Sequence, residues 1–533
     1  MVGSGWRIAA IVFIVTVLKW ESYNSQVVMK YGGITLVGLL VGWIMGDPIT
    51  GLIVGGTMEL MQVGLLGVVG SSVPDYQIGA CVGVVLAITS GKGLDMALVV
   101  GVPAATLNVN FDILAKMAGE CLMHTAQSLV GRGHYRSGFA LIAFSSLSRA
   151  FFTGTLPTLM YLTLGSLFVS DLVDYAPQWL WSGMRLAGGI LPALGICLLM
   201  RTLPNRALLG VMAGFILSAM LKLPMLAVAA IGVVAAVGAY RLAVSKSRCN
   251  ESIRNAPAFD DCSECERKDA ITGQLPRATL WRVFLRYLCV LQSAFNYETH
   301  ISCGAVYAVE PALKRIYNGD EELHRHSLMS YFRFYNCQAY FSAPLLAASL
   351  AVEESMHSVE GVEVAGHMRA SLMGPLTGVG DALFNTALKA VMASFCAHYA
   401  LEGNPLGVVL CMTFGVFLLP VRWKMFLLGY RQGARWVLRE HGTMQCLITA
   451  LLVLESLILG SMIATNVTLP GVADALTGSV FIRQLAVWNL PGLVVFALMY
   501  VLLRSRTIQI PPQWMVWIIV IVCVSERFVT SLG

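Results

Sequence analysis

The stretch Gly55-Gly56-Thr57-Met58-Glu59-Leu60-Met61-Gln62 places a carboxylate inside an apolar segment that is interrupted by glycine. A second element of this kind reads Met373-Gly374-Pro375-Leu376-Thr377-Gly378-Val379-Gly380-Asp381. A carboxylate among membrane-compatible residues is costly unless it has a partner or faces water. Glycine and proline beside it indicate helices that break around a polar cavity within a membrane. The two elements therefore predict an all-α membrane protein with discontinuous or re-entrant helices.

The composition of the chain agrees with a membrane protein. Of its 533 residues, 57% are hydrophobic and 12% are charged, and the mean hydropathy is +0.71, which is far more apolar than a typical soluble domain. The net charge of +6 is small for this length and does not indicate a nucleic-acid partner. Basic residues beside the apolar segments are better explained as cytoplasmic orientation signals. We therefore expect a multi-pass protein in the lipid bilayer, with residues 6–20 retained as a first helix because no small-residue cleavage site follows them.

The chain divides at a charged stretch. Residues 246–269 carry five basic and six acidic side chains, and we place a linker at 246–279. Before it, residues 1–245 hold closely spaced apolar segments, several of them shorter than the ~20 residues that a straight span needs. After it, residues 280–533 begin with amphipathic segments such as 323–335, which suit a membrane surface or a protein interface. The sequence thus predicts two helical lobes, the second with amphipathic surface helices.

Cysteine and histidine patterns give no strong signal for a metal or redox site. The 13 cysteines are scattered, and the one C-x-x-C pair, Cys262 and Cys265, has no histidine nearby to complete a ligand set, so an ordinary loop is the preferred interpretation. The nine histidines form no recognisable catalytic or ligand arrangement. The stretch 374–381 lacks the lysine of a phosphate-binding loop. We expect no catalytic residue, no metal and no cofactor on this chain.

Two interpretations of the first acidic element stay open. Thr57, Glu59 and Gln62 lie near one another on a helical surface, where they can exchange hydrogen bonds with the hydroxyls of a carbohydrate. Alternatively, the glycines serve close helix packing and Glu59 pairs with an arginine. Asp75 follows Gly70 to Pro74, and a capping role for a helix that starts near Tyr76 is favoured there.

A third polar element has a similar ambiguity. Gln292 and Asn296 are four residues apart and would share one helical face, with Glu298 close by. Amide and carboxylate groups interleaved with aromatic rings suit a carbohydrate, because they offer hydrogen bonds to its hydroxyls and flat faces to its C–H surface. An ordinary amphipathic helix fits the pattern equally well. The same two interpretations apply to Asn336 and Gln338.

At these residues the chain resembles a known family. The first half resembles the IIC component of mannose-family permeases of the bacterial sugar phosphotransferase system, in Gly46-Asp47, Gly51 to Glu59, Pro74-Asp75-Tyr76, 88–93 and 112–116. The second half is similar to the IID component, in Asn296-Tyr297-Glu298, Asn336 with Gln338, 343–346, Glu353-Glu354 and 372–381. Because the two components are usually separate chains, we interpret this chain as a natural IIC–IID fusion joined by the charged linker.

The resemblance implies a function. It implies a bacterial inner-membrane permease of a phosphoenolpyruvate-dependent system, which binds a hexose or amino sugar and translocates it for phosphorylation by a separate IIB unit. It also implies soluble IIA and IIB phosphocarrier partners and a homotrimer. The phosphorylated residues belong to those partners, so none is expected here, and whether this translocating subunit counts as an enzyme stays open.

The candidate site residues follow from the sequence patterns and the resemblance together. The main expected sugar contacts are Glu59, Asn296 and Glu298. Secondary contacts are expected at Gln62, Asp75, Gln292, Asn336 and Gln338. Close backbone approach at a moving interface is expected at Gly374, Gly378 and Gly380, with Asp381 fixing that segment.

Two departures from the family pattern bear on the substrate. Gly67 stands where mannose-type IIC components usually carry asparagine, and the sequence 67–76 is more similar to the branch that handles N-acetylgalactosamine and related amino sugars. In the IID-like half, a Pro-x-Phe-Trp…Arg-Pro pattern is replaced by Ala382, Phe384, Asn385, Lys389 and Ala390. The altered segment motivates an alternative function, a non-transporting membrane sugar receptor or sensor that retains the permease fold.

Overall fold

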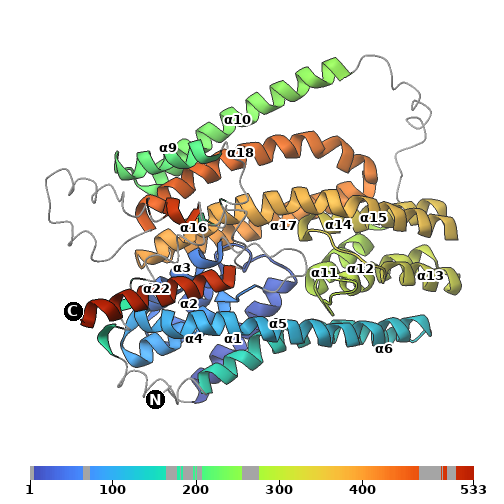
Figure 1. The fold of residues 1–533 in the computed structure, drawn as a ribbon. Helices are drawn as coiled ribbons and strands as arrows, with labels where there is room; N and C mark the ends of the chain where they lie inside the picture. Colours follow the sequence, from blue (N-terminus) through green and yellow to red (C-terminus); the bar gives the residue numbers. More distant parts are fainter. Residues whose placement is uncertain are drawn as a thin grey trace.

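The described part of the chain is helical. The computed structural model describes residues 5–63, 73–163, 207–254, 275–466 and 512–532, with a few more between 177 and 200 and between 494 and 500. Within these ranges β pairing is limited to isolated bridges at His300. The predicted all-α class is confirmed. The elements, drawn in Figure 1, are α1 (Gly5–Tyr23), α2 (Gly33–Met45), α3 (Pro48–Val63), α4 (Tyr76–Ser90), α5 (Gly93–Gly131), α6 (Tyr135–Ala150), the π-helix η1 (Phe151–Thr155), α9 (Ala207–Ala219), α10 (Met225–Arg254), α11 (Arg277–Val290), α12 (Ser302–Ile316), α13 (Glu321–Tyr331), α14 (Ala339–Met356), α15 (Val359–Gly380), the π-helix η3 (Asp381–Ala387), α16 (Leu388–Leu401), α17 (Leu406–Gln432), α18 (Ala434–Asn466) and α22 (Pro512–Leu532).

Long and short apolar helices are mixed. Five helical stretches within the described ranges are long and apolar enough to cross a membrane: Gly93–Gly131, Tyr135–Thr163, Met225–Ser245, Leu406–Gln432 and Cys446–Thr465. The apolar helices α2, α4 and α9 have only 13, 15 and 13 residues, below the ~20 needed for a straight span. Spans and shorter apolar helices together match the broken-helix organisation that the sequence predicts.

Small residues hold the short helices of the first lobe together. A Cβ atom built on Gly51 of α3 would lie 2.3 Å from the carbonyl oxygen of Gly38 in α2, and one on Gly79 of α4 would lie 2.6 Å from that of Gly101 in α5. Helix backbones approach this closely only where side chains are absent. The glycines around Glu59 therefore fix α3 firmly against α2.

The second lobe begins with amphipathic helices, as predicted. In α13, Leu328 and Tyr331 are buried whereas Arg325 is exposed. Asp320 caps this helix, because its side chain accepts a hydrogen bond of 2.9 Å from the backbone N–H of Leu323. The apolar stripe packs α13 against α12 and α15, and the opposite face stays polar.

The two lobes are interleaved. Helices α9 and α10 lie along α18, and the hairpin of α5 and α6 contacts helices α11 to α13 (Figure 1). Between α3 and α16, a Cβ on Gly56 would lie 2.8 Å from the Cβ of Ala400. The Oγ atoms of Ser218 in α9 and Ser461 in α18 are 2.9 Å apart. Contacts on several sides thus place the second lobe directly against the polar elements of the first.

Some predicted boundaries differ or fall outside the described residues. Helix α10 continues to Arg254, so the first nine residues of the expected linker (246–254) are helical, and α11 begins at Arg277. Residues 255–274, which include Cys262 and Cys265, lie outside the described ranges. Residues 64–72, which include Gly67, also lie outside them.

Candidate substrate cavity

A polar cavity of about 500 Å³ lies between the lobes. Helices α1 to α6 and the residues just before α2 and α4 form the first-lobe wall, and residues 292–295 with η3 and α16 form the other. Its volume falls in the range of about 300–1,000 Å³ that small-molecule sites occupy. A smaller cavity of about 180 Å³ adjoins it and shares Gln26, Lys30, Gln292 and Asp381.

The cavity collects most of the sequence-predicted site residues. Glu59, Gln62, Asp75, Gln292 and Asp381 line the larger cavity. Asn336 and Gln338 line the smaller one. Neither cavity is lined by Asn296 or Glu298.

Glu59 is held by the start of a neighbouring helix. Its side chain is buried, and Oε2 accepts hydrogen bonds from the backbone N–H groups of Ile34 and Thr35, at 2.9 and 3.2 Å. These donors belong to the first turn of α2, where the helix dipole stabilises a negative charge. Lys389 of α16 lines the same cavity and interacts with Glu59 electrostatically. Glu59 therefore has backbone N–H groups and a lysine as its partners, in place of the arginine that the alternative interpretation expected.

Asp75 caps α4 and also faces the cavity. Its Oδ1 accepts a hydrogen bond of 3.2 Å from the backbone N–H of Gln77, which confirms the capping role. Its Oδ2 accepts from Asn108 at 2.8 Å and forms an ion pair with the buried Lys19 of α1. One carboxylate thus joins α1, α4 and α5 at the cavity wall.

A charged network on α5 and α6 was not predicted as part of the site. Asp112 pairs with Lys116 at 2.8 Å and with Arg149 at 3.4 Å. The Arg149 guanidinium donates a hydrogen bond of 2.5 Å to Oε1 of Gln292 and lies 4.5 Å from the ring centre of Phe295, both in the second lobe. Asp112 and Lys116 belong to a stretch that matches the family pattern, which is the one sequence signal that pointed to them. No sequence pattern described above pointed to Arg149.

The segment that departs from the family pattern forms part of the wall. Ala382, Phe384 and Asn385 lie in the π-helix η3, a rare distortion that is often found at functional sites, and Lys389 and Ala390 lie in the first turn of α16. Asn385 donates a hydrogen bond of 2.6 Å to Asp381 and accepts one from Lys30 of the first lobe. Phe384 stacks on Tyr340 with ring centres 4.1 Å apart. Substitutions in this segment therefore change the cavity itself.

Asn296 organises a turn, which corrects the predicted helical face. Helix α11 ends at Val290, so Gln292 and Asn296 do not share a helix surface. The buried Asn296 side chain accepts hydrogen bonds from the backbone N–H groups of Glu298 and Thr299, at 2.9 and 2.7 Å. This side chain satisfies the turn at residues 296–299 and does not face either cavity.

Glu298 lies outside the cavity walls. Its side chain is 52% exposed, and Oε2 lies 2.9 Å from Nε2 of His124 on α5. The structure therefore does not bring Glu59 and Glu298 into one shared cavity. The second-lobe residues that line the cavity with Glu59 include Gln292, Asp381 and Lys389.

Only one of the three predicted glycines in α15 makes a close approach. A Cβ on Gly380 would lie 2.8 Å from the Cβ of Gln338 and from Cδ2 of Phe341. At Gly374 and Gly378 nothing lies within 4 Å of that position, and α15 runs through both without a break.

The walls carry buried polar atoms with no partner among the described residues. They include Oε1 of Gln62, Nε2 of Gln77, Oδ1 of Asn108 and Nε of Arg149 in the larger cavity, and Nε2 of Gln338 and Nδ1 of His300 in the smaller one. Buried polar groups in proteins are nearly always hydrogen-bonded. Atoms of this kind are therefore available to a polar ligand or to water.

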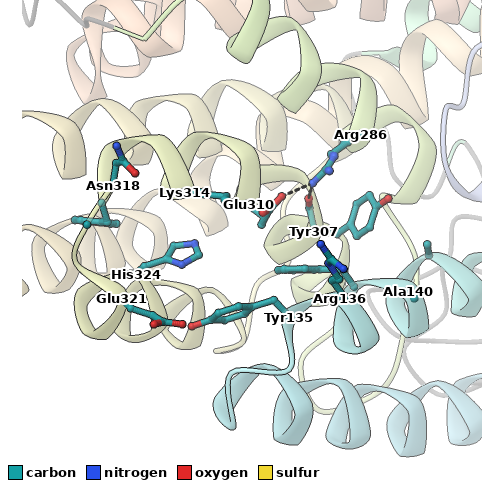
Figure 2. A pocket seen from close by; sticks show the side chains of 14 residues that line it. Tyr135, Arg136, Ala140, Arg286, Tyr307, Glu310, Lys314, Asn318, Glu321 and His324 are labelled. Atoms are coloured by element: carbon teal, nitrogen blue, oxygen red, sulfur yellow. Dashed lines mark hydrogen bonds and ion pairs between the residues drawn. The ribbon is translucent and has the colours of Figure 1, made fainter.

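A further cavity of about 650 Å³ lies between α6 and helices α11 to α13 (Figure 2). Arg286 and Glu310 form an ion pair of 2.6 Å in its wall, and the ring centres of Tyr135 and His324 are 5.4 Å apart. Burial lowers the pKa of His324. Although this cavity is larger, none of the predicted site residues lines it, whereas five of them line the cavity between the lobes.

Comparisons with known proteins identify both lobes. Residues 6–238 match the family described as PTS system sorbose-specific IIC component, and residues 274–531 match the PTS system mannose/fructose/sorbose family IID component. The mannose-specific EIID component of Escherichia coli K12 is 28% identical over 261 residues, which cover 46% of this chain and 90% of that protein. The sorbose-specific EIIC component of Lacticaseibacillus casei is 25% identical over 204 residues, or 37% of this chain and 72% of that protein. Among solved structures, a complex of the mannose transporter ManYZ with microcin E492 matches at 25% identity, with a TM-score of 0.29, over 47% of this chain and 96% of that one.

Membrane helices and matches to both components define a sugar-translocating permease of the phosphotransferase system, a multi-pass protein of the bacterial inner membrane. The chain belongs to the mannose/fructose/sorbose family and carries its IIC and IID components in one polypeptide. This confirms the predicted fusion. Membership implies soluble IIA and IIB partners and a sugar substrate. The matched descriptions name sorbose, mannose and fructose, and the amino-sugar branch stays a prediction.

Proposed function

We propose that the 500 Å³ cavity holds the transported sugar, a hexose or an amino sugar, before it passes to the IIB unit. The observation that carries this proposal is the set of unpartnered atoms on Gln62, Gln77 and Asn108 at the cavity wall. Two of these atoms accept hydrogen bonds and one donates. Sugar hydroxyls supply both donors and acceptors, so they can satisfy all three atoms at once.

The remaining wall is suited to an uncharged ligand with many hydroxyls. Glu59 is oriented by α2, and Asp75 by Lys19 and Asn108, so both carboxylates are in place before a ligand binds. Such preorganisation lowers the entropic cost of binding. Phe295 offers an aromatic ring beside these polar groups, on the wall that the second lobe provides.

We propose Glu59, Gln62, Asp75 and Gln292 as sugar contacts in this cavity. Asn336 and Gln338, together with Asp381, would contact the sugar in the adjoining smaller cavity as it moves. Asn296 and Glu298 shape the turn that follows Phe295 and are not proposed as contacts. Residues Asn385 and Lys389, which depart from the family pattern, would influence the choice of sugar because they line the wall.

The direct test is phosphorylation-coupled uptake of labelled hexoses and amino sugars in cells that contain cognate IIA and IIB and no other permease. Gln62→Leu and Gln77→Leu remove unpartnered polar atoms without adding charge, and we expect each to reduce uptake by about tenfold, the equivalent of one hydrogen bond. Gln127→Leu, on α5 and lining neither cavity, is the matched control. Wild-type uptake in both cavity variants would contradict the site.

The same experiment separates transport from the sensor alternative. A purified chain that binds a sugar but never supports its uptake with IIA and IIB would favour the sensor. We also propose the homotrimer that the family resemblance implies. Native mass measurement in detergent tests it, and a single 57.6 kDa species would contradict it.

A further inference from the structure

A second polar cluster lies outside the cavity, where α5 of the IIC domain meets the 294–299 segment of the IID domain. Glu120 and His124 are four residues apart on α5, so they project from one face of that helix. Glu298 reaches the same point from the other domain. One ligand atom from each of the three side chains lies within 4.8 Å of the others, and His124 Nε2 lies 2.9 Å from Glu298 Oε2.

The backbone holds these three side chains in register. A Cβ built on Gly119 would lie 2.4 Å from the carbonyl oxygen of Phe295, so the IID segment rests directly on α5 beside Glu120. The Asn296 side chain then fixes the backbone N–H of Glu298 at 2.9 Å. The position of Glu298 relative to α5 therefore follows from backbone packing and does not depend on its ion pair with His124.

We propose that Glu120, His124 and Glu298 form a zinc-binding site that bridges the IIC and IID domains. One imidazole nitrogen and two carboxylate oxygens are a donor set that zinc accepts, with water in the fourth position. Calcium and magnesium prefer oxygen ligands throughout, whereas imidazole suits zinc, copper and nickel. Zinc–ligand bonds of 2.0–2.2 Å in tetrahedral geometry put ligand atoms about 3.4 Å apart, so the three side chains need only small adjustments.

The local charge favours a cation. With a neutral imidazole, two carboxylates face each other across this site, and no pairing other than His124 with Glu298 is recorded for them among the described residues. The nearest cation on the same helix, Lys116, is paired with Asp112 and lies over the ring of Tyr297. The local sequence did not reveal this site, because its third ligand, Glu298, comes from the other domain.

Zinc binding to the purified full chain tests the proposal. All proteins carry Cys262→Ser and Cys265→Ser, so that this thiol pair does not take up zinc. The protein with only these two changes is the parent. In a titration against a chromophoric chelator, we expect the parent to bind one more zinc ion than the His124→Gln variant does. Glu120→Gln and Glu298→Gln should lower the affinity for that zinc ion at least about tenfold, because each removes a charged ligand. The matched control is His134→Gln, an exposed histidine after α5, which should bind as the parent does.

Two further measurements keep the test decisive if a variant is damaged. Thermal unfolding without zinc should be the same for all four variants, because the three ligand side chains are at least partly exposed. Zinc should raise the unfolding temperature of the parent and of His134→Gln only. Cobalt added to the parent should show the visible absorption of a tetrahedral site that zinc then displaces. Equal zinc affinity in the parent and the three ligand variants, or a cobalt spectrum that zinc leaves unchanged, would overturn the proposal.

Discussion

Glu59 and Glu298 were predicted to play the same part, and the structure separates them. Glu59 is buried at the cavity wall and bonded to two backbone N–H groups of α2. Glu298 is half exposed, lies beyond the cavity and faces a histidine of the other domain. Both glutamates lie in stretches that match the family pattern, so the pattern alone does not distinguish their roles. The difference lies in the groups that surround each carboxylate.

The largest expected loss of stability is at Asp75, a cavity carboxylate that pairs with a buried lysine and contrasts with the exposed Glu298. Asp75→Leu leaves the Lys19 ammonium without its partner, and we expect a loss of about 3–5 kcal/mol in the free energy of unfolding. Glu298→Gln should cost less than about 1 kcal/mol, as exposed pairs do. Chemical unfolding in detergent measures both. Lys19→Met combined with Asp75→Leu should regain part of the loss; no regain would show that the ion pair is not the cause.

Transport should separate the two glutamates next. Glu59→Gln keeps the size of the side chain but removes the charge that the α2 N–H groups bind, a change of about 1.5–3 kcal/mol. We expect uptake to fall by about tenfold to a hundredfold. Glu298→Gln should stay within about twofold of the wild type. The reverse order would return the Asn296–Glu298 turn to the sugar site.

Asn296→Ala distinguishes a turn-forming residue from a sugar contact. The variant removes the acceptor of two backbone N–H groups, at Glu298 and Thr299, and we expect a cost of about 1–3 kcal/mol for the buried one, at Thr299. We expect a lower unfolding temperature with the KM for sugar nearly unchanged in the protein that remains folded. A raised KM at an unchanged unfolding temperature would instead indicate direct contact.

A smaller effect is expected along α15. Gly380→Ala adds a methyl group 2.8 Å from Gln338 and Phe341, and we expect it to destabilise the protein by about 1–3 kcal/mol and to slow uptake. Gly378→Ala is the matched control, since it meets open space in a helix and should stabilise the protein by up to about 1 kcal/mol. Equal uptake in both variants would remove Gly380 from the moving interface.

The smallest effect concerns a partly exposed surface carboxylate, Glu363. Hydrogen bonds from Arg333 hold the pKa of Glu363 below its usual range. A pKa depressed in the folded state stabilises the protein above the unfolded pKa, near 4.5, and this contribution is lost as the pH falls through the folded value. We expect Arg333→Gln to lower the unfolding temperature slightly at neutral pH, and the difference to vanish in acid. A difference that grows in acid would contradict this sign.

Local sequence predicted the parts of the fold that depend on local chemistry. The all-α class, the short glycine-broken helices and the amphipathic helix at 321–331 follow from composition and periodicity. The polar surroundings of Glu59 follow from the cost of a carboxylate in apolar sequence. Asp75 was recognised as a cap because the capping interaction spans only two residues.

Contacts between distant segments were not predictable in this way. Arg149 and Lys30 reach the cavity because helices far apart in the chain converge there. In the sequence, nothing but their charge distinguishes these two residues from their neighbours. The helical face expected for Gln292 and Asn296 was wrong because the asparagine side chain bonds nearby backbone N–H groups and competes with the helix. The four-residue spacing of Gln292 and Asn296 gave no information about that competition.

The packing of α9 and α10 along α18 has a consequence for how this polypeptide is organised. These helices of the IIC half pack directly on α18 of the IID half, with Ser218 facing Ser461 and Gly214 against the backbone of Leu457. We therefore expect the halves to adhere without their covalent connection. A protease site introduced between 255 and 274 should therefore yield two fragments that still co-purify. The peptide connection then guarantees equal copy number of the halves, while the affinity between them resides in the helices.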